Sequence, residues 1–135
     1  MSNVNPTDRR YTKDHEWAFD VGDGTITMGI TDHAQEQLTD IVYVELPETG
    51  KVVNAADPIA VVESVKSVSD ILSPVSGEIL EVNKKLETNP ELINQDAFGK
   101  GWIAKLSMSD PAEFGNLMDA AGYERMIAEE GPPQE

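Results

Sequence analysis

Short apolar stretches, separated by glycine, proline and polar turns, run along most of this chain. Residues at every second position are apolar, or the stretch is β-branched and short, and both patterns indicate strands rather than helices. Between the first two stretches lies Gly22-Asp23-Gly24, which permits positive φ angles and predicts a hairpin. The predicted strands are Trp17–Val21, Thr25–Ile30, Ile41–Leu46, Lys51–Val53, Ile59–Val62, Ile71–Leu72, Gly77–Val82 and Trp102–Leu106.

Two short helical segments interrupt these strands. Asp32 is of a residue type that caps helices, and Gln35 follows it by three positions, as in a capping box. We therefore expect a short helix that runs to about Leu38. A second helical turn is expected from Pro90 to Ile93, since proline suits the first turn of a helix.

The pattern changes to helical spacing after residue 108. Ser109 or Asp110 can cap a helix there, and proline stands in its first turn. The apolar residues that share one face of this helix are Phe114, Leu117 and Met118. A second helix is predicted over Tyr123–Glu130, with Gly122 separating the two.

Length and composition indicate one domain of the mainly β or α+β class. The chain has 135 residues, of which 39% are hydrophobic, which is enough for one buried core but not for two. We expect residues 1–10 to be a flexible N-terminus, residues 11–130 to form the domain with its C-terminal helices, and residues 131–135 to be a flexible tail.

Charge and cysteine content exclude several functions. Ten Lys and Arg residues against 25 Asp and Glu residues give a net charge of −15, which disfavours nucleic acid and membrane surfaces and favours basic protein partners. The chain has no cysteine, so any sulfur chemistry must come from a cofactor. Without an apolar signal-peptide core or membrane span, a cytoplasmic protein is expected, although a mature mitochondrial form would look the same.

One polar stretch, from Glu63 to Ile71, separates two β-branched runs that Pro58 and Pro74 bound on the outside. This arrangement predicts a hairpin with Lys66 at its tip. Most such lysines only solvate a turn. A free lysine amine has a pKa near 10.4 and is a poor nucleophile unless it is buried, so covalent modification is favoured over direct catalysis by Lys66.

Other candidate chemistry is sparse. His15 and His33 show no metal-ligand spacing, and no glycine-rich phosphate loop is present. A small hydrolase that uses His15 and Glu16 is kept as an alternative from the enzyme class.

With these residues in view, the chain resembles the H-protein family of the glycine cleavage system. The resemblance covers YTKDHEW (11–17), GITDHAQEQLTDIVYVELPETG (29–50), VVESVKSVSDILSPVSGEILEVNKKLETNPELIN (61–94) and GKGWIAKL (99–106). It implies a lipoyl/biotinyl-type barrel-sandwich hybrid that acts as a non-enzymatic, monomeric carrier. Lys66 would bear lipoate in amide linkage.

The resemblance also implies the partners. Glycine decarboxylase (P protein) would load an aminomethyl group on the arm, aminomethyltransferase (T protein) would remove it, and dihydrolipoamide dehydrogenase (L protein) would reoxidise the dithiol. Lipoate-attaching enzymes would also bind the chain. A lipoyl or biotinyl carrier domain of another complex, or a lipoate relay protein, is the alternative; biotin carriers usually flank the lysine with methionines, whereas Val65 and Ser67 stand here.

Four further residues take roles from the resemblance. Glu16 and Asp70 would bind the amine of the loaded arm in a surface cleft, provided that their carboxylates converge. Glu63, three residues before Lys66, and Gly77, eleven after it, match positions that lipoate-attaching enzymes read in lipoyl domains. Asp14 departs from the family pattern, in which a serine is common before His-Glu-Trp.

Overall fold

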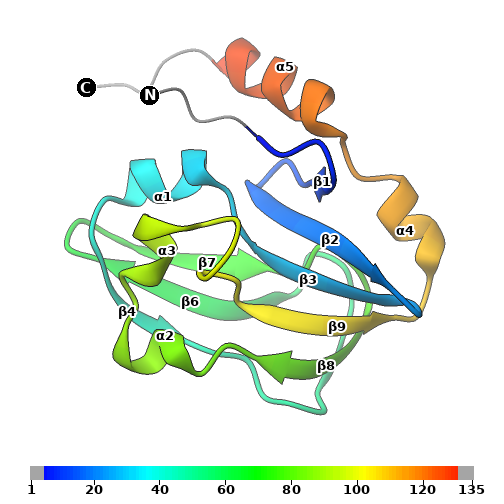
Figure 1. Cartoon of the computed structure of the whole chain (residues 1–135), viewed down its shortest axis with the longest axis horizontal. Helices are drawn as coiled ribbons and strands as arrows, with labels where there is room; N and C mark the ends of the chain where they lie inside the picture. The colour runs from blue at the N-terminus through cyan, green and yellow to red at the C-terminus, as the bar shows by residue number, and fades with distance from the viewer. Residues whose placement is uncertain (1–4, 131–135) are drawn as a thin grey trace.

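Two antiparallel sheets enclose a single main core, and helices cover their ends (Figure 1). The computed structural model describes residues 5–130. Its strands are β1 (Arg10–Tyr11), β2 (Glu16–Gly22), β3 (Thr25–Ile30), β4 (Ile41–Glu45), β5 (Val52–Val53), β6 (Pro58–Ser64), β7 (Val68–Leu72), β8 (Gly77–Val82) and β9 (Ala104–Met108). Its helices are α1 (Asp32–Leu38), α2 (Lys85–Thr88), α3 (Leu92–Gln95), α4 (Pro111–Gly115) and α5 (Ala120–Glu130).

The larger sheet has the strand order β1-β2-β3-β9-β8-β5, and the smaller one has the order β4-β6-β7. Alternate residues of both sheets point inward, as expected for strands with one buried face. Ile26 and Met28 of β3 are fully buried in this way, as are Val62 of β6 and Ile79 of β8. The predicted mainly β architecture with short helices is confirmed.

A second, smaller core lies beneath α5, at the top of Figure 1. Tyr11 and Tyr123 are fully buried and stack with ring centroids 4.7 Å apart. Trp17 belongs to the same cluster, and the Arg9 guanidinium lies 4.7 Å from its ring centroid. The predicted tail at 131–135 and the first four residues of the predicted N-terminal segment lie outside the described residues.

Both predicted hairpins are present. Gly22, Asp23 and Gly24 have φ angles of 96°, 59° and 74°, so the turn between β2 and β3 uses the positive φ that its composition predicts. Strand β6 pairs antiparallel with β7, and Glu63 faces Val68 at the end of the ladder that adjoins the loop.

The helix start predicted at Asp32 is wrong by one residue. Thr31 is the N-cap of α1, and its hydroxyl accepts the N–H of Ala34. Asp32 instead lies in the first turn, where its carboxylate accepts a hydrogen bond from the Gln35 side chain at 2.7 Å. Helix α2 has only one turn and was not predicted, since four residues are too few to show a helical period.

The C-terminal elements also differ from the prediction. Asp110 caps α4, but this helix ends at Gly115, because Met118 forms an antiparallel bridge to Tyr11 instead. Helix α5 begins at Ala120, so Gly122 lies inside it rather than before it. The carboxylate of Asp119 accepts the N–H of Gly122 and thereby starts the helix.

The last strand begins later than predicted, at Ala104 rather than at Trp102. The carbonyl of Trp102 accepts a hydrogen bond from the Asn83 side chain at 2.8 Å and is therefore engaged outside the sheet. The residue pairing of β9 with β8 then extends to Met108, which faces Gly77.

Gly77 opens β8 where two strands come too close for a side chain. A Cβ atom placed on Gly77 would lie 1.7 Å from the carbonyl oxygen of Ser107 in β9. Because both groups belong to paired backbones, neither can move without disrupting the ladder. Gly77 is therefore required by packing, whatever else recognises it.

We expect Gly77→Ala to lower the free energy of unfolding by about 1–3 kcal/mol, because the new methyl group overlaps a backbone carbonyl. Urea denaturation followed by circular dichroism measures the change. Gly115→Ala is the matched control, since nothing lies within 4 Å of the place that its new methyl group would take and alanine favours helix. Equal losses in the two variants would contradict this account.

Candidate functional site

Lys66 lies in the loop that joins β6 to β7, as predicted. The loop is held by Ser64, whose hydroxyl oxygen accepts the N–H groups of Lys66 at 3.1 Å and of Ser67 at 3.0 Å. The N–H of Ser64 also donates to the carbonyl of Ser67 at 2.8 Å. A single serine at the end of β6 thus fixes the backbone on both sides of the lysine.

The loop is also attached to the segment around α1. The N–H of Val65 donates to the carbonyl of Asp40 at 3.0 Å, and the Lys66 ammonium donates to the carbonyl of Gln37 at 3.2 Å. The lysine itself is exposed, and its neighbours Val65 and Val68 are 68% and 66% exposed. Lys66 is therefore an accessible amine between two exposed valines, on a backbone that other elements hold in place.

A cleft of about 270 Å³ lies beside this loop, between α1 and β7. Asp70 lines it from β7, and Asp14 and His15 line it from the segment before β2. Leu38 and Ile71 contribute apolar walls. The cleft therefore combines two carboxylates with apolar surface next to the loop that bears Lys66.

Glu16 points into the interior instead. It is 2% exposed, and its carboxylate accepts hydrogen bonds from the Thr12 hydroxyl at 2.6 Å and from the N–H of Leu72 at 3.1 Å. Burial raises the pKa of Glu16 to about 7, and the charge of Asp14 adds to the rise, while the two hydrogen bonds oppose it.

Glu16 and Asp70 line neighbouring clefts rather than one. Glu16 belongs to a cleft of about 340 Å³ that Thr12, Leu72 and Met118 also line. Asp14 lines both clefts. Asp14, which departs from the family pattern, is therefore the residue shared by the cleft of Glu16 and the cleft of Asp70.

Tyr123 is a site residue that sequence reasoning missed. Its hydroxyl lies 2.8 Å from Nδ1 of His15 and 2.7 Å from the hydroxyl of Thr31, so α5 supports the cleft wall from behind. His15 has a φ of 71°, and its ring centroid lies 4.7 Å from that of His33. No local pattern could reveal this support, because Tyr123 is 108 residues away from His15.

The two predicted recognition residues, Glu63 and Gly77, lie at different distances along the chain from the Lys66 loop. Glu63 is half-buried in β6, between Tyr43 of β4 and Val68 of β7, and so adjoins the loop. Strand β7 leads the chain away from the loop, and Gly77 follows beyond its far end. The recognition role of both residues stays a prediction.

Neither a metal site nor a membrane span emerges from residues 5–130. Within that range, no three His, Asp or Glu side chains are grouped so that they could hold a metal ion. None of the helices described there has the length and apolar content needed to cross a membrane.

The raised pKa of Glu16 predicts a pH-dependent stability. Because the pKa is about 7 in the folded protein and 4.5 ordinarily, the folded state binds the Glu16 proton more tightly than the unfolded state. The contribution of Glu16 to the free energy of unfolding therefore falls as the pH rises from about 4.5 to 7. Glutamine imitates the protonated carboxyl group and does not titrate.

The free energy of unfolding of Glu16→Gln minus that of the original protein should therefore rise by about 2 kcal/mol when the pH is raised from 5 to 8. Chemical denaturation of both proteins at each pH measures this difference. A difference that stays constant over the range would show that Glu16 is ionised in the folded state throughout.

Comparison with known proteins identifies the family of the chain and agrees with its fold. Residues 9–130 match the family model for the glycine cleavage H-protein. The glycine cleavage system H protein of Thermus thermophilus is 55% identical over 125 residues, which cover 93% of this chain and 97% of that protein. The corresponding protein of Cronobacter sakazakii is 53% identical over 130 residues, or 96% of this chain and 100% of its own length.

Among solved structures, a glycine cleavage system H protein from Mycobacterium marinum superimposes with a TM-score of 0.84 at 39% identity. The match covers 92% of this chain and 99% of that one. The predicted barrel-sandwich hybrid is thereby confirmed. From the family match and these relatives, we conclude that the chain belongs to the glycine cleavage H-protein family.

Proposed function

We propose that this chain is the lipoyl carrier of the glycine cleavage system, with lipoate in amide linkage on Lys66. The observation that carries this proposal is the exposed Lys66 on a loop whose backbone Ser64 holds from both sides. An attached arm needs a rigid base and an amine that an attaching enzyme can reach. The family membership of the chain supports the same conclusion.

The residues around Lys66 fit an acyl chain that ends in a dithiolane. Val65 and Val68 offer exposed apolar surface on both sides of the lysine, and the neighbouring cleft has the apolar walls Leu38 and Ile71. When bound, lipoate would supply the sulfur that this cysteine-free chain lacks, and with it the capacity to carry an aminomethyl group and two electrons.

The chain's own residues would position and shield the arm. In the cleft beside the loop, the carboxylates of Asp70 and Asp14 would accept hydrogen bonds from a protonated amine, while Leu38 and Ile71 limit the access of water. Glu16 would act from the adjoining cleft, where its carboxyl group holds the N–H of Leu72 and so fixes the end of β7.

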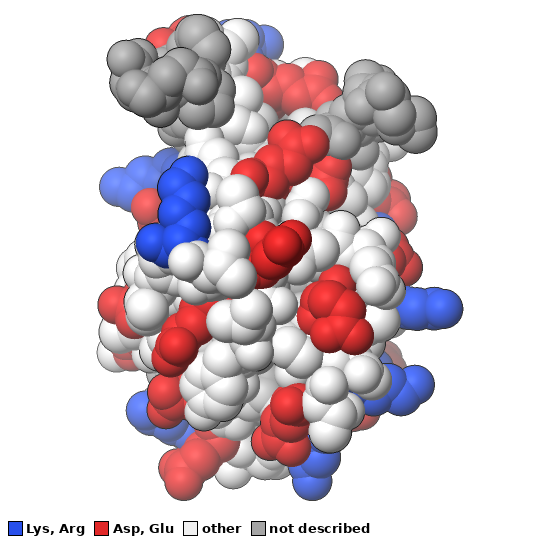
Figure 2. Space-filling model, turned by 90° about the vertical axis from the view of Figure 1, so that its left-hand side faces the viewer, with Lys and Arg blue, Asp and Glu red and all other residues white. Residues whose placement is uncertain are grey.

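The proposed partners are the P, T and L proteins and the lipoate-attaching enzymes. The attaching enzymes would read Glu63, which adjoins the Lys66 loop, and Gly77, which lies beyond the far end of β7. Figure 2 shows the side of the molecule on which the loop between β6 and β7 lies in Figure 1, and acidic side chains are spread over its centre. Partners with basic surfaces around their active sites would be steered toward this side. The carrier itself would be a monomeric, cytoplasmic protein that catalyses no step.

Lys66→Arg should abolish both lipoylation and glycine cleavage, because arginine keeps the charge but offers no amine for acylation. The measurement is intact mass after co-expression with a lipoylation system, together with glycine cleavage by the reconstituted P, T and L proteins. Lys51→Arg, which changes an exposed lysine outside the hairpin, is the matched control and should be modified and active. A biotin mass, or activity in the unmodified protein, would refute the proposal.

Asp70→Asn should shorten the lifetime of the loaded form several-fold, because the cleft loses a charge that pairs with the amine. The lifetime is followed by mass spectrometry after loading with glycine and P protein. Asp20→Asn, which changes an exposed acid on β2, should leave the lifetime unaltered. Unchanged lifetimes in both variants would remove Asp70 from the docking site.

A further inference from the structure

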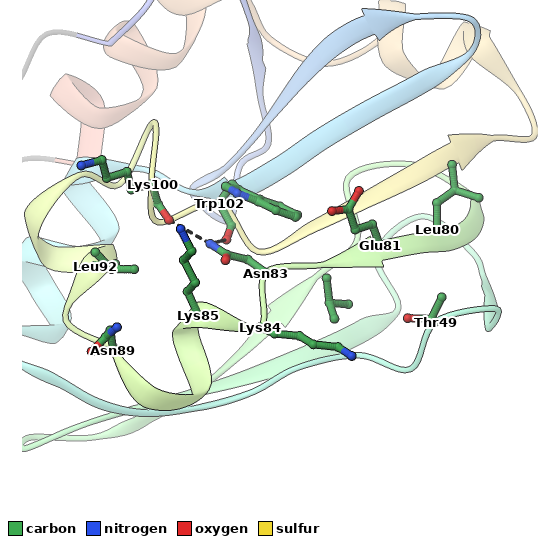
Figure 3. Close-up of a pocket in the computed structure, with 11 residues that line it drawn as sticks. Thr49, Leu80, Glu81, Asn83, Lys84, Lys85, Asn89, Leu92, Lys100 and Trp102 are labelled. Atoms are coloured by element: carbon green, nitrogen blue, oxygen red, sulfur yellow. Dashed lines mark hydrogen bonds between the residues drawn. The ribbon is translucent and has the colours of Figure 1, made fainter.

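A wide cleft on another part of the molecule has no part in the proposed carrier function. It measures about 970 Å³ and lies between the end of β8, α2 and the segment that leads into β9 (Figure 3). None of the residues that line it also lines the cleft beside the Lys66 loop. Val82 and Leu92 contribute apolar surface, and Trp102 forms one wall.

The wall of this cleft is preformed. The side-chain amide of Asn83, which is 5% exposed, donates to the carbonyls of Lys100 and Trp102, both at 2.8 Å. These two bonds are the dashed lines in Figure 3. Asn83 also donates its own N–H to the carbonyl of Ile103 at 3.0 Å. A buried side chain thus holds the tryptophan segment in place without a ligand.

The charge of the cleft is opposite to that of the molecule. Lys84, Lys85 and Lys100 line it, although the whole chain has only ten Lys and Arg residues and a net charge of −15. Within residues 5–130 these three ammonium groups form no ion pair. The cleft's one acid, Glu81, forms an ion pair with Lys105 at 3.7 Å.

The shape of the cleft favours an extended occupant over a small anion. Figure 3 shows Lys84 directed toward Thr49, Lys85 directed toward the segment of Lys100 and Trp102, and the Lys100 side chain extending away from both, so the ammonium groups do not converge on one point. No arginine lines the cleft, and no buried side-chain polar atom in the described residues lacks a partner. A compact phosphate site would need such converging donors.

We infer that this cleft binds an acidic, extended segment of a partner protein. Carboxylates of the segment pair with Lys84 and Lys85, and an apolar side chain of the segment contacts Trp102. The net charge of −15 repels an acidic segment, so local positive charge such as that of the cleft is needed for the segment to bind. A nucleic acid is disfavoured, because its denser charge meets repulsion from the net charge of −15.

A short labelled peptide of glutamates with one central leucine tests this inference on the intact protein. Fluorescence anisotropy gives the affinity, and tryptophan emission locates the contact, because Trp17 is buried and Trp102 is partly exposed. We expect binding that weakens with salt and a change in tryptophan emission. Lys84→Glu/Lys85→Glu should weaken binding roughly tenfold, whereas Lys84→Arg/Lys85→Arg should retain it.

The matched control is Lys13→Glu/Arg125→Glu, which makes the same change in net charge at exposed positions outside the cleft. It should bind the peptide nearly as well as the original protein. If both charge-reversed variants lost affinity for the peptide equally, overall charge alone would explain the effect, and the inference would be overturned. Displacement of the peptide by equimolar inorganic pyrophosphate would identify a small-anion site instead, and no binding to the original protein would also overturn it.

Discussion

The buried carboxyl group of Glu16 connects the two sheets and fixes the end of β7 that lies opposite the Lys66 loop. Glu16 starts β2 in the larger sheet, while the N–H group that it accepts belongs to Leu72, at the end of β7 in the smaller sheet. Apolar packing holds the sheets together but does not fix how they are aligned. A directional hydrogen bond within the low dielectric of the interior does so, at the cost of burying an ionisable group.

The same arrangement changes how the predicted docking residues are understood. By their resemblance to family positions, Glu16 and Asp70 are expected to be two equivalent surface acids. The structure gives them different surroundings. Asp70 is exposed on a strand beside the loop, whereas Glu16 is buried with a raised pKa. Asp14 lies between them and lines both clefts. An amine bound here would therefore meet an exposed carboxylate at one end and a partly protonated carboxyl group near the other.

The sequence predicted local structure well, because local rules govern it. The Lys66 hairpin follows from β-branched runs bounded by prolines, and the bounds of β3 and β8 are those that alternation predicts. Prediction from the sequence failed where a residue far away in the chain determines the local structure. Thr31 and Asp32 are both good helix caps, and the buried hydroxyl of Tyr123 bonds to the first. The need for glycine at position 77 likewise comes from Ser107, which lies thirty residues further along the chain.

The contact between Lys66 and Gln37 links the chemical state of the loop to a helix. Gln37 lies in the last turn of α1, where unpaired carbonyls carry partial negative charge, and that turn has no basic residue of its own. The Lys66 ammonium supplies the missing positive charge from outside the helix. Acylation would replace this cation by a neutral amide with a single N–H. The C-terminal turn of α1 would then fray more readily, so an enzyme that contacts this helix could distinguish the unmodified protein from the finished carrier.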